Sequence, residues 1–175
     1  MQEKILTSTR IYDGVLVKLD VQEVELPDGS TSKREVIQHP GAVAVIAIDG
    51  DDVLLVKQFR SASREVTLEL PAGTLEPNEP PEISAIRELQ EEIGYKPEVI
   101  ESLGGFYNAP GYTTEYIHLF RASELVESRL PGDSDEFIEV VRLPITEALT
   151  MIETGKITDS KTIIGLLRVA RAMHI

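Results

Sequence analysis

Three glutamates crowd one stretch of this chain at a spacing that suits metal chemistry. Glu88, Glu91 and Glu92 lie at positions i, i+3 and i+4 of a segment predicted to be helical over residues 80–93, so their carboxylates converge on one face. Like charges at this spacing destabilise a helix by roughly 0.2–0.5 kcal/mol per pair. A divalent cation such as Mg²⁺ or Mn²⁺, which prefers oxygen ligands, would offset the repulsion. The alternative is an acidic face that is solvated and binds nothing.

The helix that carries these acids also has an apolar face. Ile83, Ile86, Leu89 and Ile93 recur at helical spacing and fall within about 120° of arc, nearly opposite the glutamates. Gly94 follows them and is a natural C-terminal cap. The pattern therefore predicts a helix that buries its isoleucines and leucine and points the three carboxylates outward.

The residues around this helix form a longer pattern. Five residues separate Gly73 from Glu79, seven more separate Glu79 from Arg87, and residues 87–95 read Arg-Glu-Leu-Gln-Glu-Glu-Ile-Gly-Tyr. This pattern resembles the Nudix box, Gly-x5-Glu-x7-Arg-Glu-U-x-Glu-Glu-x-Gly-U, in which U is a bulky apolar residue. Every fixed position is present at its spacing. Only Tyr95 departs, because an aliphatic residue is usual there.

The resemblance implies roles for the acidic residues. Glu88 and Glu92 would be the principal metal ligands, Glu91 a ligand to a further ion, and the carbonyl of Ala72 a backbone ligand. Arg87, beside the carboxylates, would orient them through charge-assisted hydrogen bonds. The implied reaction is the hydrolysis of a nucleoside diphosphate linked to another moiety, with metal ions that neutralise the diphosphate and activate water.

Two other box residues have roles in the loop before the helix. Gly73 has no side chain, so the backbone there can approach substrate and metal closely. Glu79 either structures the loop or supports the ligands from behind.

The resemblance extends beyond the box to bacterial ADP-ribose pyrophosphatases. It covers about residues 5–170, and the stretches that carry it are residues 33–45, 56–60, 68–73 and 109–115. Pro110 lies 15 residues past the end of the box, the spacing associated with this subgroup. The implied reaction splits ADP-ribose into AMP and ribose 5-phosphate.

Further site residues follow from this narrower resemblance. Arg60 is a candidate for the adenine or diphosphate pocket, and Glu115 for the ribose side or an additional metal. Glu136 is our choice for the general base that activates water, since it lies in a segment that resembles the acidic loop of the family. Asp135 and Glu139 are close alternatives for that base.

The N-terminal segment is expected to take part in a dimer. Arg34 and Glu35 lie in the segment that these enzymes contribute across a dimer interface, which implies a homodimer and makes both residues candidate substrate contacts, with Pro110. The predicted division is residues 1–40, an N-terminal strand segment exchanged in the dimer, and residues 41–175, a Nudix domain.

The loop around Pro110 departs from the subgroup. Members often have Ser before the proline and an acidic residue before Glu115, whereas this chain has Ala109 and Thr114. Because that loop touches the terminal sugar in the family, another nucleotide sugar such as ADP-glucose or GDP-mannose stays open as the substrate. A hydrolase of nucleoside triphosphates or caps and a non-catalytic nucleotide-binding module are further alternatives.

The elements that would position these residues indicate a mixed α/β (α+β) fold. Apolar runs bounded by turn residues predict strands, and helical spacing predicts three helices. The expected strands are two within residues 5–25, then 34–39, 42–48, 53–59, 68–70, 99–106, 116–120 and 137–143; the expected helices are 80–93, 145–153 and 161–174. The resemblance implies a Nudix-type α/β/α sandwich with a mixed sheet, plus an N-terminal antiparallel strand layer.

Composition sets the remaining bounds. The 175 residues include 30 Asp and Glu against 17 Lys and Arg, a formal charge of −13, which disfavours binding to nucleic acid or anionic membranes. No apolar run approaches the roughly 20 residues of a membrane span, and no signal peptide is recognisable. There is no cysteine, so disulfides and thiolate chemistry are excluded. We expect a cytoplasmic protein.

Overall fold

The computed structural model describes residues 1–132 and 136–174. The chain forms two units, one of residues 1–41 with 107–116 and one of residues 42–106 with 117–175, and each is described by itself. Within the described residues, no helix has the length and apolar character needed to cross a membrane.

The first unit is built on a three-stranded antiparallel sheet. Its strands are β1 (Lys4–Asp13), β2 (Lys18–Glu25) and β3 (Thr31–Gln38), in the order β1-β2-β3. The turn between β2 and β3 forms because Asp28 accepts hydrogen bonds from the backbone and hydroxyl of Ser30, and Gly29 takes φ of 85°, which glycine adopts without strain. The predicted hairpin and third strand are confirmed.

The second unit contains a seven-stranded mixed sheet. Its main path is β10-β5-β4-β9-β8, with β6 paired to β5 and β7 paired to β4. The strands β4 and β9 run parallel, and the other registered pairs of this sheet are antiparallel. The bounds are β4 (Ala42–Asp49), β5 (Asp52–Arg60), β6 (Glu65–Glu69), β7 (Ala72–Thr74), β8 (Tyr95–Tyr107), β9 (Tyr116–Glu127) and β10 (Glu139–Pro144).

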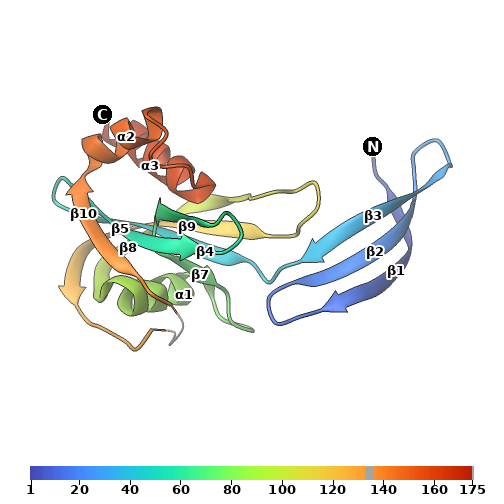
Figure 1. Cartoon of the computed structure of the whole chain (residues 1–175), viewed down its shortest axis with the longest axis horizontal. Helices are drawn as coiled ribbons and strands as arrows, with labels where there is room; N and C mark the ends of the chain where they lie inside the picture. The colour runs from blue at the N-terminus through green and yellow to red at the C-terminus, as the bar shows by residue number, and fades with distance from the viewer. Residues whose placement is uncertain (133–135, 175) are drawn as a thin grey trace. The chain divides into compact units, whose positions relative to one another are not determined.

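Helices cover both faces of this sheet. The helix α1 (Pro81–Glu88) lies on one face, and α2 (Ile145–Glu153) and α3 (Ser160–Met173) lie on the other (Figure 1). Alternate residues of β4 supply both cores, since Val43 and Val45 pack with Leu89, while Ala44 and Ile46 pack with Leu166. The α/β/α sandwich with a mixed sheet is confirmed.

The helix predicted over residues 80–93 ends differently from the prediction. After α1 the α-helix does not continue to residue 93, because residues Leu89–Ile93 form a π-helical turn. The Gly94 amide donates to the Leu89 carbonyl at 3.0 Å. Gly94 then ends the helix with φ of 80°, so the predicted cap is confirmed. Such π-turns concentrate at functional sites.

The predicted burial of this helix is partly wrong. Ile83 is 54% exposed, whereas Glu88 and Glu92 are each only 9% exposed. The reason is that β7, a short strand that the sequence analysis did not separate from its neighbours, pairs with β4 beside the helix. The carboxylates therefore face backbone and not open solvent.

Candidate active site

Two of the clustered carboxylates are buried against the start of the box. The amide of Ala72 donates to Glu92 Oε2 at 2.9 Å. A Cβ added at Gly73 would overlap the carboxylate of Glu88, so any larger residue there would push that carboxylate out of its place. The backbone at residues 72 and 73 thus lies within reach of any ion that the two carboxylates would bind.

Arg87 holds the other acids of the box together. Its guanidinium donates to both carboxylate oxygens of Glu79 at 2.9 and 3.0 Å, to Glu88 at 2.8 Å and to Glu91 at 2.9 Å. Hydrogen bonding from Arg87 lowers the pKa of Glu79 to about 2. Since Glu79 also accepts from the Glu76 amide at 3.2 Å, it links the loop to the helix through Arg87.

Glu88 and Glu92 are electrostatically under-compensated. Burial raises the pKa of Glu88 to about 7, against the opposing effect of Arg87. Burial also raises the pKa of Glu92 to about 8, against the hydrogen bond from Ala72. The negative charge of Glu136 raises the pKa of both, which places Glu136 within electrostatic range of the pair.

The donor set of this cluster fits a hard divalent cation. Among residues 1–132 and 136–174, no three acidic or histidine side chains are arranged as a group that could hold a metal ion. Glu91 and one oxygen of Glu88 are hydrogen-bonded to Arg87 instead. The available ligands are nevertheless all oxygens, the kind that Mg²⁺ and Mn²⁺ prefer. Two buried carboxylates with raised pKa values are also the groups that a cation would stabilise most.

A buried carboxylate outside the box, that of Glu69, lies near the site, and the sequence analysis did not identify it. Glu69 is 2% exposed and accepts from Arg60 Nε and Nη2 at 2.8 and 2.7 Å, from Thr67 and from Lys161 Nζ. Burial works against ionisation, but Arg60 and Lys161 outweigh it and lower the pKa of Glu69 to about 2. The only sign of its burial in the sequence was its position between Leu68 and Leu70.

Arg60 is held at the edge of this site by that pair. Its pKa is raised chiefly by the hydrogen bonds to Glu69, with smaller contributions from Glu92 and Asp159. Within the described part of the chain, Nε and Nη2 are the only Arg60 nitrogens that donate a hydrogen bond to protein. Its remaining nitrogen, Nη1, is thus available to a ligand.

The first unit contains the other predicted substrate contacts. Arg34 on β3 pairs with Glu3 at 2.5 Å, and Glu35 follows it on the same strand. Glu115 accepts from the side-chain amide of Asn108 at 2.8 Å. Pro110 lies in the turn between β8 and β9, in the same unit.

The three candidates for the base differ in what can be said of them. Glu136 is exposed and acts electrostatically on the two buried glutamates. Glu139, on β10, pairs with Lys57 at 3.3 Å. Asp135 lies outside the described residues.

Comparison with known proteins agrees with this site. The model of the NUDIX domain matches residues 38–164, which include the whole box and both sheet faces around it. The chain belongs to the NUDIX family. Proteins of this family are generally dependent on divalent metal ions, in keeping with the buried acids.

Relatives match this NUDIX chain over most of its length. An ADP-ribose pyrophosphatase of Bacillus subtilis is 42% identical over 165 residues, 93% of this chain and 89% of the relative. A methanol dehydrogenase activator of Bacillus methanolicus is 45% identical over 168 residues, 94% and 91% of the two chains. A GDP-mannose pyrophosphatase of Yersinia enterocolitica is 41% identical over 144 residues, 76% and 75%.

A solved structure supports the fold of this NUDIX chain. The crystal structure of an ADP compounds hydrolase superposes with a TM-score of 0.89 and covers 99% of this chain and 95% of its own, at 21% identity. At that identity the likeness concerns the fold.

Proposed function

We propose that this chain is a Mg²⁺-dependent hydrolase that splits the diphosphate of ADP-ribose into AMP and ribose 5-phosphate. The observation that carries the proposal is the pair of buried glutamates, Glu88 and Glu92, whose pKa values of about 7 and 8 report a shortage of positive charge. The similarity to an ADP-ribose pyrophosphatase over 93% of the chain supports the choice of substrate.

The proposed metal ligands are Glu88, Glu91 and Glu92 with the carbonyl of Ala72. Mg²⁺ is the expected ion, and Mn²⁺ would occupy the same oxygen ligands. A bound ion supplies charge neutralisation for the diphosphate and lowers the pKa of water. Glu79 anchors the Arg87 guanidinium from the other side, so Arg87 would stay beside the carboxylates when they bind the ion.

Glu136 is proposed as the base that takes the proton from the attacking water. Its exposed position and its electrostatic effect on Glu88 and Glu92 support this role. Glu139 is less suited, because its carboxylate is paired with Lys57.

Arg60 is proposed to bind the diphosphate. The buried Glu69 fixes two of its nitrogens, so the guanidinium is preorganised and a third nitrogen can donate to a phosphate oxygen.

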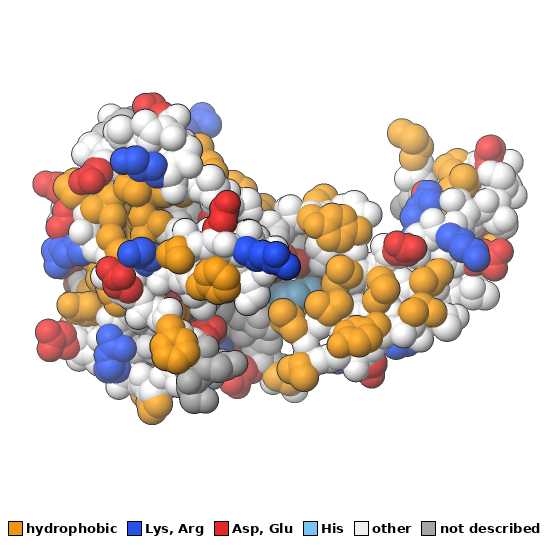
Figure 2. Space-filling view, in the orientation of Figure 1, with side chains coloured by type: hydrophobic (Ala, Val, Ile, Leu, Met, Phe, Trp, Pro, Cys, Tyr) orange, Lys and Arg blue, Asp and Glu red, His pale blue; other side chains and the backbone are white. Residues whose placement is uncertain are grey.

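We propose that the first unit completes the substrate site in a homodimer. Arg34, Glu35, Pro110 and Glu115 would contact the adenosine and ribose ends, with the N-terminal strands exchanged between protomers. The apolar side chains gathered on the β1–β3 sheet support a covering partner (Figure 2). Those that the single chain leaves exposed include Ile5, Leu6, Ile11, Tyr12, Val15 and Leu16.

A panel of nucleotide sugars tests the proposed function. We expect ADP-ribose to be the best substrate with Mg²⁺, and AMP and ribose 5-phosphate to be the products resolved by ion-exchange chromatography. Turnover of ADP-glucose or GDP-mannose without turnover of ADP-ribose would overturn the substrate assignment. Ala109 and Thr114 make this comparison necessary, because they depart from the subgroup in the loop expected to contact the terminal sugar. Binding of these compounds without any hydrolysis would overturn the enzymatic one.

The relative from Bacillus methanolicus suggests a second candidate function. Its identity of 45% over 94% of this chain favours a test of whether this protein also activates a methanol dehydrogenase. We expect no activation by the Glu92→Gln variant if the effect needs hydrolysis. Equal activation by that variant would separate it from the site described above.

A further inference from the structure

The segment that leads from β9 to Glu136 is bonded to the π-helical turn of the box. We call residues 127–132 the connector. The Ser128 amide donates to the Gly94 carbonyl at 2.9 Å, and the Leu130 amide donates to the Gln90 carbonyl at 3.1 Å. The side chain of Gln90 also donates to Ser128 Oγ at 2.9 Å. The connector therefore runs along the turn that carries Glu91 and Glu92.

The π-turn creates the acceptors that the connector uses. Because Gly94 donates to Leu89 and then ends the helix in the left-handed region, the carbonyl of Gln90 lies among the last ones of the helix, which lack a helical partner. Leu130 supplies that partner. The carbonyl of Gln90, which has no partner within the helix, is thus satisfied by the amide of Leu130.

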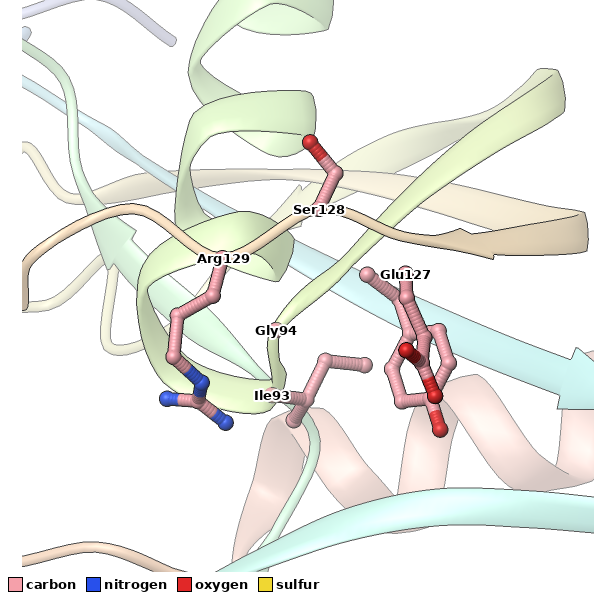
Figure 3. Close-up of a pocket in the computed structure, with 6 residues that line it drawn as sticks. Ile93, Gly94, Glu127, Ser128 and Arg129 are labelled. Carbon is pink, nitrogen blue, oxygen red and sulfur yellow. The ribbon is translucent and has the colours of Figure 1, made fainter.

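Direct packing between the connector and the helix end is limited. A cavity of about 440 Å³ opens between them, lined by Ile93, Gly94, Tyr95, Glu127, Ser128 and Arg129 (Figure 3). Arg129 lies across Gly94, where an added Cβ would come within 2.8 Å of its guanidinium. The hydrogen bonds of Ser128 and Leu130 to Gly94 and Gln90 therefore set the register between the two segments.

The far end of the connector lies against a metal-ligand candidate. A Cβ added at Gly132 would be 3.5 Å from the carbonyl oxygen of Glu91. Glu136 follows Gly132 by four residues, so their Cα atoms are at most ~15 Å apart. The connector thus lies against the turn that carries the proposed ligands, and the proposed base follows it by four residues.

We propose that the Gln90–Ser128 hydrogen bond is a positioning contact that sets Glu136 relative to Glu88 and Glu92. Gln90 occupies one of the variable positions of the box, so the box pattern assigns its side chain no role. The inference rests on the proposed function, because Glu136 must act as the base. A positioning role predicts a loss in turnover with substrate and metal binding unchanged.

Three variants test the contact: Gln90→Ala, Ser128→Ala and the double variant. We expect each to lower kcat roughly five- to tenfold, the factor of one hydrogen bond, with KM for ADP-ribose and Mn²⁺ affinity within twofold of wild type. The double variant should lose no more than either single one, since both remove the same bond. Ser128→Thr keeps the hydroxyl and should restore kcat to within twofold.

Ser102→Ala is the matched control, because the Ser102 hydroxyl also bonds to protein, accepting from the Gly104 amide at 3.3 Å, but lies outside the connector. It should keep kcat. Unchanged kcat in Gln90→Ala and Ser128→Ala, or a fall in Mn²⁺ affinity that matches the fall in kcat, overturns the inference while wild-type turnover upholds the proposed function. Absence of wild-type turnover of any nucleotide sugar overturns both.

Discussion

The second unit buries carboxylates in two places, and their pKa values shift in opposite directions. Glu69 is 2% exposed and meets Arg60 and Lys161, and its pKa falls to about 2. Glu88 and Glu92 are 9% exposed. Glu88 accepts from Arg87 and Glu92 from the Ala72 amide, and their pKa values rise to about 7 and 8. Similar burial therefore gives opposite results, because only Glu69 has enough positive charge within the protein.

The difference separates a structural acid from a ligand. A buried charge with its partners in place stabilises only modestly but costs several kcal/mol when a partner is lost. A buried charge without partners is a standing cost unless an ion from outside compensates it. We conclude that Glu69 organises Arg60, and that Glu88 and Glu92 are arranged for a cation.

Removing a ligand should have the largest effect. Glu92→Gln should lower kcat by about a thousandfold, roughly 4 kcal/mol in transition-state stabilisation, because a metal ligand is lost. The melting temperature of the metal-free protein at pH 8 should rise, since an uncompensated buried charge is removed.

Glu82→Gln, an exposed acid on the same helix, is the control for steady-state kinetics and should keep kcat. Wild-type turnover in Glu92→Gln would refute the ligand assignment. A lower melting temperature would refute the claim that Glu92 lacks compensation.

Removing the compensated acid should have the opposite signature. Glu69→Gln should lower the free energy of unfolding by about 3 kcal/mol, because Arg60 and Lys161 lose their buried partner. Urea unfolding measures it, with Glu65→Gln on the exposed part of β6 as the control. A loss below about 1 kcal/mol would mean that Glu69 is not the charge-compensated acid that distinguishes it from Glu88 and Glu92.

Replacing the proposed base should affect turnover alone. Glu136→Gln should lower kcat about a hundredfold, roughly 2.7 kcal/mol, and change KM much less, because the base acts in the transition state. Glu139→Gln breaks only an exposed pair with Lys57 and should keep kcat within twofold. The reverse result in stopped-time product assays would move the base to Glu139.

The smallest effect concerns pH. Glu88 and Glu92 have folded pKa values above the ordinary glutamate value of 4.5. The folded protein therefore retains protons that the unfolded chain loses, and stability falls as pH rises from about 5 to 8. We expect the free energy of unfolding of the metal-free protein to fall over this range, in the direction that the two raised pKa values set. Glu69 has the opposite sign, and its contribution is lost only as pH falls from about 4.5 towards 2.

Urea unfolding in the presence of EDTA at several pH values measures this dependence. Saturating Mg²⁺ should abolish most of the decline. Stability that stays level or increases from pH 5 to pH 8 without metal would contradict the raised pKa values.

Local patterns in the sequence predicted much of this arrangement. The box spacing identified Glu88, Glu91 and Glu92, and the run of apolar residues over 42–48 predicted the strand that the structure shows as β4. The buried position of Glu88 was missed, because helical periodicity assigns it to the outward face and only the pairing of β7 with β4 covers it.

Contacts between distant residues could not be predicted in the same way. Lys161 lies 92 residues beyond Glu69, and Ser128 lies 38 residues beyond Gln90. Neither pair has a local signature, since each is brought together by the packing of α3 or of the connector. The π-turn at residues 89–93 likewise depends on Gly94 and the connector, which supply partners for its last carbonyls.

The most direct test is calorimetric titration of the metal-free protein with Mn²⁺ at pH 7.5, in two buffers of different ionisation enthalpy. The account predicts one tight binding event in wild type that releases protons, because Glu88 and Glu92 are partly protonated at this pH and must ionise to bind. Glu92→Gln should lose the affinity, and Glu82→Gln should keep it. Binding without proton release, or with equal affinity in Glu92→Gln, would contradict the claim that these two buried acids hold the cation.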